Sequence, residues 1–228
     1  MRVERSFAFI DLSGFTTLTA AEGDERAVAL LSSFRSIARE VCSRRGVRIA
    51  KWLGDGAMLV SVDSTSLLAT LLDIEHSMKA AKSKLSVRSG ATVGEVILLE
   101  GDDYIGNPVN VAARLCDIAP GGEVYVTPEI ANARPAWASV SAPIMLEVKG
   151  FSEPVEVVAL TFQRPLGEAN ACPVCGIPLI PDTASSTSTN AVGALVLFCS
   201  ESCHETWDRR PRLTAEDQGS LRSPLMGS

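Results

Sequence analysis

The sequence predicts an α+β fold: a ferredoxin-like, split βαβ core with an antiparallel sheet and helices on one of its faces. Segments with the alternating apolar pattern of strands and segments with the apolar spacing of helices follow one another in the order strand, helix, strand, strand, helix, strand. Hydrophobic residues make up 46% of the 228 residues, which is enough to support a sizeable core. Several topologies share this order of elements, and the split βαβ arrangement is one of them.

The first part of the chain supplies a strand, a long helix and a hairpin. Residues 3–11 are predicted to form a strand because their side chains alternate between two faces. Asp24 is the expected cap of a long helix, whose apolar residues recur at helical spacing. Residues 47–53 and 57–62 flank the sequence Gly54-Asp55-Gly56. An Asp-Gly pair between two apolar runs is typical of a hairpin turn.

The second part repeats the pattern with a helix, a strand and a further helix. Asp63 or Ser64 caps a helix that continues to Lys79, and residues 87–99 are again strand-like. A helix is predicted at residues 108–118, because a proline lies in its first turn and a Pro-Gly-Gly sequence follows it. Short strands are expected at residues 123–126, 145–148 and 154–160.

The sequence divides into two units of unequal size. Apolar periodicity stops at residues 163–171, which we interpret as a linker between a first domain, residues 1–162, and a small second unit, residues 172–212. The last segment, residues 213–228, is polar and contains Gly and Ser, so it is expected to be disordered. Because the linker is polar, residues 1–165 are expected to stay folded without the second unit.

Charge and hydropathy exclude two classes of partner. The formal net charge is −6 and the pI is about 5.1, which argues against a surface that neutralises nucleic-acid phosphates. The charged start of the chain, residues 1–5, does not have the pattern of a signal peptide. The longest apolar runs, such as residues 191–198, are far shorter than the about 20 residues of a membrane helix. We therefore expect a cytoplasmic protein without a membrane partner.

Three segments carry residues suited to chemistry. Residues 7–16 read FAFIDLSGFT and residues 51–56 read KWLGDG, so each has an aspartate beside a glycine turn. Residues 103–114 read DYIGNPVNVAAR. Together these segments resemble the catalytic domain of class III nucleotide cyclases. The resemblance covers roughly residues 5–161 and extends to two short sequences, GEV at 94–96 and VKG at 148–150.

Asp11 and Asp55 are the candidate ligands of divalent metal ions. Mg²⁺ prefers oxygen ligands and typically takes one or two carboxylates together with phosphate oxygens. A hairpin paired beside the first strand would bring the two carboxylates close together. An aspartate before a glycine is by itself most often part of a turn. The resemblance assigns both residues to two Mg²⁺ or Mn²⁺ ions in each active site, with the carbonyl group of Ile10 as a further ligand.

The remaining site residues concern the nucleotide. Asn110 and Arg114 lie four residues apart on a predicted helix and so project from one face. The resemblance implies that Arg114 stabilises charge on the α-phosphate, that Asn110 orients the ribose and that Lys149 contacts the polyphosphate. Lys51 and Asp103 offer a donor and an acceptor that match N1 and the 6-amino group of adenine. This pair points to ATP, although a shift of one residue would replace Asp103 by the aspartate before it.

The resemblance therefore implies an adenylyl cyclase, which converts ATP to 3′,5′-cyclic AMP and pyrophosphate for intracellular signalling. Domains of this family act as head-to-tail dimers that share their active sites. All the residue types required are present in this one chain, so a homodimer would have two equivalent sites. Two alternatives remain open: a catalytically silent nucleotide-binding regulatory module, and a metal-responsive sensor protein.

Four of the six cysteines form two close pairs, Cys172 with Cys175 and Cys199 with Cys203. In a chain without an export signal, such pairs favour a metal over disulfides. Four thiolates suit one tetrahedral Zn²⁺ ion, and a unit of about 40 residues rarely folds without such a site. The unit resembles the YHS/TRASH-type treble-clef zinc modules, which share the CPVCG sequence, an apolar strand and a second cysteine pair.

The remaining residues of interest are a tryptophan, a proline and a histidine of the second unit and two isolated cysteines of the first domain. Trp207 and Pro211 match the aromatic residue and the proline of such modules, and His204 is an alternative metal ligand. Cys42 and Cys116 lie in helical patterns and are expected to be small core residues. The sequence leaves open whether the module senses a metal or only uses it for folding.

Overall fold

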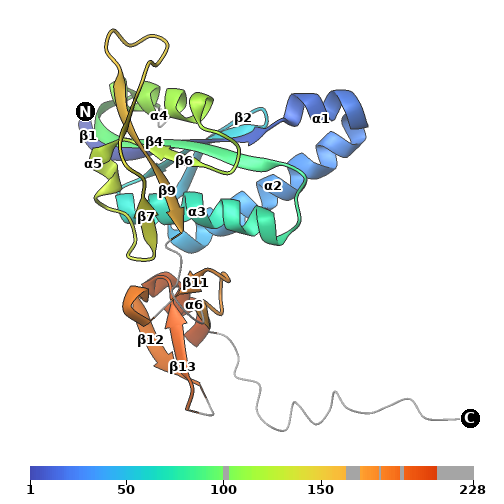
Figure 1. The fold of residues 1–228 in the computed structure, drawn as a ribbon, viewed down its shortest axis with the longest axis vertical. Helices are drawn as coiled ribbons and strands as arrows, with labels where there is room; N and C mark the ends of the chain where they lie inside the picture. Colours follow the sequence, from blue (N-terminus) through green and yellow to red (C-terminus); the bar gives the residue numbers. More distant parts are fainter. Residues whose placement is uncertain (100–102, 163–169, 180, 191–192, 210–228) are drawn as a thin grey trace, which may run out of the picture.

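The computed structural model describes residues 1–99, 103–162, 170–179, 181–190 and 193–209. The first domain is built on one nine-stranded sheet (Figure 1). Its strands are β1 (Arg2–Ser13), β2 (Arg48–Leu53), β3 (Gly56–Ser61), β4 (Ser86–Leu98), β5 (Tyr104–Ile105), β6 (Val124–Val126), β7 (Ala138–Val140), β8 (Ile144–Leu146) and β9 (Val155–Phe162). The order across the sheet is β2-β3-β1-β4-β6-β9-β7, with β5 beside β4 and β8 beside β9.

The predicted ferredoxin-like core is confirmed in the four strands β2-β3-β1-β4. All three neighbouring pairs among them are antiparallel, as the split βαβ motif requires. Outside this core the sheet has one parallel pair, because β6 pairs with β4 in parallel. The chain reaches β6 through a helix that crosses the sheet, which is the connection that parallel neighbours need.

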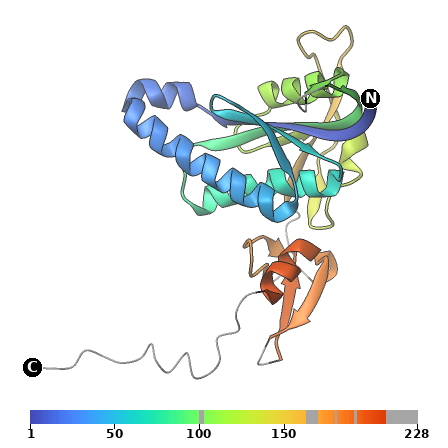
Figure 2. The same cartoon turned by 180° about the vertical axis from the view of Figure 1, so that it is seen from behind.

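The helices of this domain are α1 (Phe15–Glu22), α2 (Asp24–Arg45), α3 (Ser64–Ala80), α4 (Asn107–Ile118) and α5 (Pro128–Ala131). Helices α2 and α3 pack together on one face of the sheet, and α4 covers the other face (Figures 1 and 2). The expectation that the helices share one face is therefore wrong for α4. A Cβ atom at Gly90 of β4 would lie 2.1 Å from the backbone nitrogen of Cys116, so a glycine there lets α4 approach the sheet.

Residues of β1 alternate between these two faces. Ala8 and Ile10 belong to the main core beneath α2 and α3, whereas Phe7 packs on the side of α4. Asp11 follows the same alternation as Phe7. Its carboxylate therefore leaves the sheet on the α4 face, near the end of the strand, which continues to Ser13.

Local signals explain where several elements begin and end. The Asp63 side chain accepts hydrogen bonds from the backbone N–H groups of Thr65 and Ser66, which confirms the predicted cap of α3. Gly14, in the left-handed conformation, precedes α1, a short helix that the sequence analysis did not predict. Strands β5 and β7 and helix α5 were also not predicted, and each has four residues or fewer. Elements this short carry little periodicity.

The second unit contains the strands and helix that hold the cysteines. They are β10 (Asn170–Ala171), β11 (Pro178–Leu179), β12 (Ser186–Thr189), β13 (Leu195–Phe198), a short 3₁₀ helix (Pro181–Thr183) and α6 (Glu201–Asp208). Asn170–Ala171, which we predicted to lie in the linker, pairs with β11 instead. The rest of the predicted linker, Pro211 and the predicted disordered tail lie outside the described residues.

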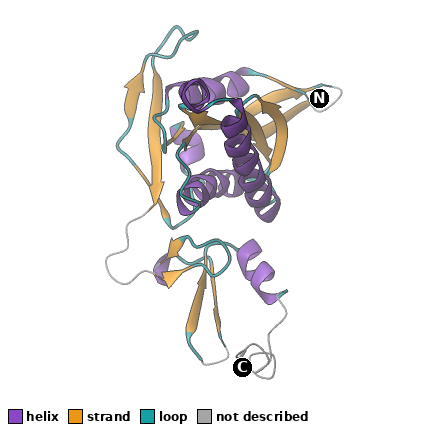
Figure 3. Cartoon of the chain, turned by 90° about the vertical axis from the view of Figure 1, so that its right-hand side faces the viewer, coloured by secondary structure: helices purple, strands orange, loops and turns teal. Residues whose placement is uncertain are grey.

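The second unit lies beneath α2 and α3 (Figure 3). Its residues Leu197, Phe198 and Cys203 belong to the same buried cluster as Phe34 and Leu71 of the first domain. The two units therefore share one hydrophobic core. Among the described residues, no helix combines the length and apolarity needed to cross a bilayer.

Candidate functional site

The structure brings Asp11 and Asp55 together, as the hairpin predicts. Strand β1 pairs with β3, and Asp11 lies opposite Gly56, the residue that follows Asp55. The pKa of Asp55 is raised above its ordinary value, first by partial burial and then by the negative charge of Asp11. Two carboxylates that repel each other in this way are a suitable site for a divalent cation.

The backbone around this pair is closely packed. A Cβ atom at Gly56 would lie 2.6 Å from the carbonyl oxygen of Ile10 and 3.1 Å from Oδ1 of Asp11. A glycine is needed here because any side chain would fill the space in front of these oxygens. Asp11 and Ile10 also line a pocket of about 290 Å³. The donor set of two carboxylates and a carbonyl oxygen fits Mg²⁺ or Mn²⁺.

Arg88, which the sequence analysis did not identify, pairs with Asp11. Its Nε and one terminal nitrogen lie 2.9 and 2.6 Å from Oδ2 of Asp11, and its other terminal nitrogen donates to the carbonyl oxygen of Asp117. The hydrogen bonds to Asp11 raise the pKa of Arg88. Arg88 is thus the cation that Asp11 binds in this structure. Only the register of β1 against β4, which places the two residues opposite each other, reveals this pair.

Asn110, Arg114 and Lys149 lie around a second pocket, of about 550 Å³. Asn110 and Arg114 project from α4, and Arg114 donates to Oδ2 of Asp117 at 2.9 Å. Lys149 is exposed in a turn after β8, close to the end of the strand predicted at residues 145–148. The structure therefore brings the three predicted phosphate and ribose ligands to one place.

Lys51 and Asp103 form an ion pair, although 52 residues separate them in the sequence. Nζ of Lys51 lies 2.6 Å from Oδ1 of Asp103, and about half of each side chain is exposed (48% and 51%). The hydrogen bond from Lys51 lowers the pKa of Asp103. The alternative aspartate, Asp102, lies outside the described residues. A cation and an anion held side by side at the surface provide one donor and one acceptor for a ligand.

The predicted site residues form three groups in one chain. Asp11 lines one pocket, and Asn110 and Arg114 line another, with Ala113 contributing to both. The Lys51 and Asp103 pair is the third group, and neither residue lines these two pockets.

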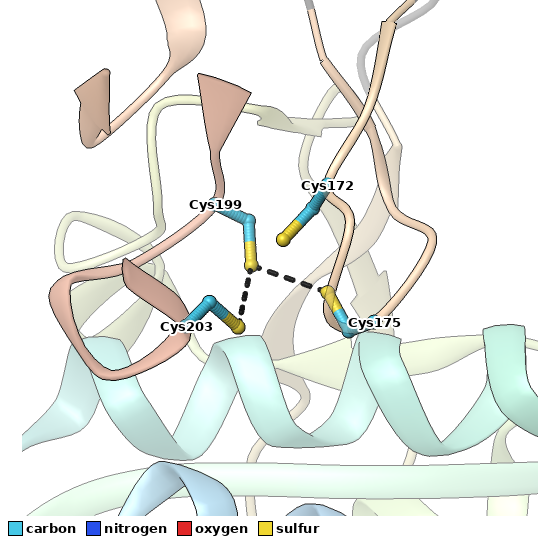
Figure 4. Close-up of side chains that lie close together, drawn as sticks. All are labelled: Cys172, Cys175, Cys199 and Cys203. Carbon is cyan, nitrogen blue, oxygen red and sulfur yellow. Dashed lines mark hydrogen bonds between the residues drawn. The ribbon is translucent and has the colours of Figure 1, made fainter. Parts of the chain in front are cut away.

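The four predicted metal-binding cysteines come together in the second unit (Figure 4). Their sulfur atoms all lie within 4.8 Å of one another, and Sγ of Cys199 is 3.3 Å from Cys175 and 3.5 Å from Cys203. Tetrahedral Zn–S bonds of about 2.3 Å would set the sulfurs about 3.8 Å apart. The cluster therefore has the size and the donor set of a tetrathiolate zinc site.

His204, the alternative ligand, and the two remaining cysteines lie outside this cluster. The ring of His204 stacks on Phe198 at 4.3 Å, with its Nε2 3.7 Å from a carboxylate oxygen of Asp208. Cys42 and Cys116 are buried in the first domain, as predicted. Burial, followed by a nearby aspartate, raises the pKa of each thiol to about 12, so both are protonated core residues.

Residues 4–157 match the family described as the adenylate and guanylate cyclase catalytic domain. An uncharacterized protein of Mycobacterium tuberculosis is 36% identical over 148 residues, which are 64% of this chain and 38% of that protein. A protein of Streptomyces coelicolor named adenylate cyclase is 32% identical over 146 residues, which are 61% of this chain and 38% of that protein. The match thus covers well under half of the length of these relatives.

Solved structures support the same fold. The adenylyl cyclase CyaB from P. aeruginosa has a TM-score of 0.65 and 24% identity, and the match covers 72% of this chain and 96% of that one. The guanylate cyclase domain of RhGC from Catenaria anguillulae, in complex with GTP, has a TM-score of 0.62 and 19% identity, covering 72% of this chain and all of the other (100%). The nine-stranded sheet with its helices is therefore the fold of these cyclase domains.

Proposed function

Because the chain belongs to the family of adenylate and guanylate cyclase catalytic domains, we propose that it is an adenylyl cyclase that forms 3′,5′-cyclic AMP and pyrophosphate from ATP. The observation that carries the choice of ATP is the ion pair between Lys51 and Asp103. Adenine has an acceptor at N1 and donors at its 6-amino group, and guanine reverses this pattern. Nζ of Lys51 would donate to N1, and the carboxylate of Asp103 would accept from the amino group.

Asp11 and Asp55, with the carbonyl oxygen of Ile10, would hold the divalent ions. When bound, two such ions lower the pKa of the ribose 3′-hydroxyl group and neutralise charge on the polyphosphate. With the ions bound, Asp11 would no longer need the guanidinium of Arg88 as its cation. Arg88 would then be free to move toward the phosphate oxygens that share the site, and a guanidinium group suits such oxygens.

Arg114, Asn110 and Lys149 would act on the sugar and phosphates. Arg114 carries a permanent charge that opposes the negative charge developing at the α-phosphate, while Asn110 hydrogen-bonds the ribose and orients its 3′-oxygen for in-line attack. Because these residues and Asp11 line different pockets of one chain, we propose that a head-to-tail homodimer joins them. Each of its two sites would take the aspartates from one subunit and Arg114 from the other.

A direct assay tests this proposal. Purified protein with Mn²⁺ or Mg²⁺ should form cyclic AMP from ATP, with much less cyclic GMP from GTP, and the specific activity should rise with protein concentration as dimers form. Binding of ATP without turnover at any protein concentration would instead indicate a silent regulatory module. A preference for GTP would contradict the role given to Lys51 and Asp103.

We also propose that Cys172, Cys175, Cys199 and Cys203 bind one Zn²⁺ ion. The geometric support is the mutual approach of their four sulfur atoms. Four protein ligands complete the tetrahedral shell, so the site has no open position for a substrate and its role is structural or regulatory. Elemental analysis of protein purified without chelators should find one zinc ion per chain. Four thiols that titrate freely under native conditions would contradict this assignment.

A further inference from the structure

Arg45, the last residue of α2, connects the cysteine cluster with the first domain. It is 5% exposed, and one of its terminal nitrogens lies 3.3 Å from Sγ of Cys199 and 3.9 Å from Sγ of Cys175. Its Nε donates to Oδ2 of Asp73, in α3, at 2.8 Å. A single buried guanidinium group therefore contacts a fully buried carboxylate on one side and two of the candidate metal ligands on the other.

Other hydrogen bonds also join the cysteine unit to the first domain. The indole Nε1 of Trp137, which is 1% exposed, donates to the carbonyl oxygen of Cys199 at 3.0 Å. The Ser202 hydroxyl group donates to the carbonyl oxygen of Arg44, and Arg44 itself donates to Asp73 at 2.9 Å. Trp137, Arg44 and Asp73 belong to the cyclase domain. The domain thus supplies part of the wall of the cysteine site.

The net charge of the metal-bound cysteine site explains why Arg45 should strengthen metal binding. A divalent ion with four thiolates has a net charge of −2, and a buried charge is stable only when it is paired and hydrogen-bonded. An N–H group that donates to a ligating sulfur also reduces the charge on that sulfur and orients it. Arg45 is suitably placed because its planar guanidinium group, with several N–H donors, can donate to Asp73 and Cys199 at the same time.

Helix α2 also holds the turn that carries Asp55. A terminal nitrogen of Arg35 donates to the carbonyl oxygen of Gly54 at 2.8 Å. The ring of Phe34 packs edge-on against Trp52 of β2, with 6.3 Å between the ring centres. The helix whose end contacts the cysteine cluster therefore contacts, in its middle, the hairpin of the proposed magnesium site.

We propose that Arg45 makes the four-cysteine metal centre an integral part of the cyclase domain, so that metal binding orders α2 and the Asp55 turn and thereby regulates the cyclase. This inference rests on the proposed binding of zinc at the four cysteines, but its tests do not require turnover. Arg45 is a positioning residue in this scheme: it contacts the metal ligands and acts on the active site through α2.

The first test is metal affinity. Competition with a chromogenic chelator should show that Arg45→Met lowers the Zn²⁺ affinity by about 10-fold to 100-fold, as is typical when a partner of a metal ligand is lost. Arg209→Met is the matched control, because Arg209 carries the same charge directly after α6 but is exposed and pairs with Glu205. This control should stay within about twofold of the unchanged protein. Equal affinities of the Arg45→Met and control variants would overturn the proposal.

The second test measures communication within the full chain. Removal of the metal should speed hydrogen exchange of the backbone amides at the end of α2 and in the turn at residues 53–56, and zinc should restore protection. The Arg209→Met control should show the same metal-dependent protection as the unchanged protein. In Arg45→Met saturated with zinc, protection at both places should be reduced. Exchange at residues 53–56 that does not depend on the metal would overturn the regulatory part of the proposal.

Two further results separate the possible failures. If Arg45→Met does not fold, Arg45→Lys can replace it in the test. This variant keeps the positive charge but loses the planar guanidinium group, so it should show a smaller but measurable loss of Zn²⁺ affinity. Co²⁺ binding tests the premise, because thiolate coordination gives an intense charge-transfer absorption. Absence of this absorption in the unchanged protein would overturn both the zinc site and this inference, and would leave the proposed cyclase activity unaffected.

Discussion

The Asp11 site and the cysteine cluster both offer groups that can bind a cation, but they differ in how they are enclosed. Asp11 and its partner Arg88 are partly exposed, with 23% and 31% of their side chains accessible. Cys199 and Cys203 are buried, with 2% and 0% exposed, and their partner Arg45 is buried too. An open site suits ions that arrive with a nucleotide and leave with the products. A closed site suits an ion that stays, so the difference in enclosure fits the catalytic role proposed for the first site and the structural or regulatory role proposed for the second.

The largest expected effect is at the open site. Asp55→Ala should lose a metal ligand and Arg114→Ala should lose the charge that stabilises the transition state, so each variant should fall by about 100-fold or more in kcat. Cyclic AMP formation by each purified variant measures this loss.

Mixing these two variants tests the shared site. About half of randomly formed dimers contain one subunit of each kind, and each such dimer has one site with both defects and one intact site. Up to about a quarter of the original activity should then return. No recovery, with dimers confirmed by sedimentation, would show that each chain builds its own site.

Removal of the second unit, which contains the cysteine cluster, should lower the free energy of unfolding of the first domain. A chain that ends at residue 162 uncovers Trp137 and leaves its indole N–H group without the carbonyl of Cys199. We expect a loss on the order of 2–5 kcal/mol in the free energy of unfolding, from exposed apolar surface and lost hydrogen bonds. This loss would lower Tm by roughly 5–15 °C in a thermal unfolding experiment.

A chain that ends at residue 209 is the control for this truncation, and its Tm should not change. Equal Tm values for both truncated chains would support the independent first domain that the polar linker predicts. The shared core would then contribute little to stability.

Base selection should change by an intermediate amount. Replacing Lys51 by Glu and Asp103 by Cys reverses the donor and removes the acceptor for adenine. Loss of such polar contacts is worth about 1–3 kcal/mol, so the ratio of kcat/KM for ATP to that for GTP should fall by about tenfold or more. An unchanged ratio would mean that other residues read the base.

The smallest expected effect concerns the Asp55 carboxylate of the open site, which is destabilised by partial burial and by the negative charge of Asp11. The folded-state pKa of Asp55 is raised, so the folded protein binds a proton more tightly there than the unfolded chain does. Its contribution to stability is therefore fully present below the unfolded pKa and is lost as the pH rises through the folded pKa. Asp55→Asn should stabilise the apo protein at pH 7 by less than about 1 kcal/mol, because solvent screens the pair.

Denaturant unfolding at two pH values checks this sign. The stabilisation by Asp55→Asn should be present at pH 7 and should disappear near pH 3, where the carboxyl group of Asp55 is already protonated. A destabilising effect at pH 7 would contradict the proposed repulsion.

Much of the fold and of the site could be predicted because the relevant signals are local. The alternation in residues 3–11, the Asp-Gly turn at Asp55 and the cap at Asp63 each depend on a few neighbouring residues. The placement of α4 on the opposite face could not be read in this way. It depends on the backbone contact at Gly90, which involves residues far apart in the sequence.

The sequence by itself determined which residues are available for chemistry: two aspartates at strand ends, a donor and acceptor pair, and two pairs of cysteines. Only the tertiary structure decided which cation accompanies each cluster. Arg88 faces Asp11 because of the register between β1 and β4, and Arg45 reaches Cys199 across 154 residues of sequence. The physical reason is that periodicity encodes which face a side chain occupies, whereas the partner across that face depends on how separate elements pack.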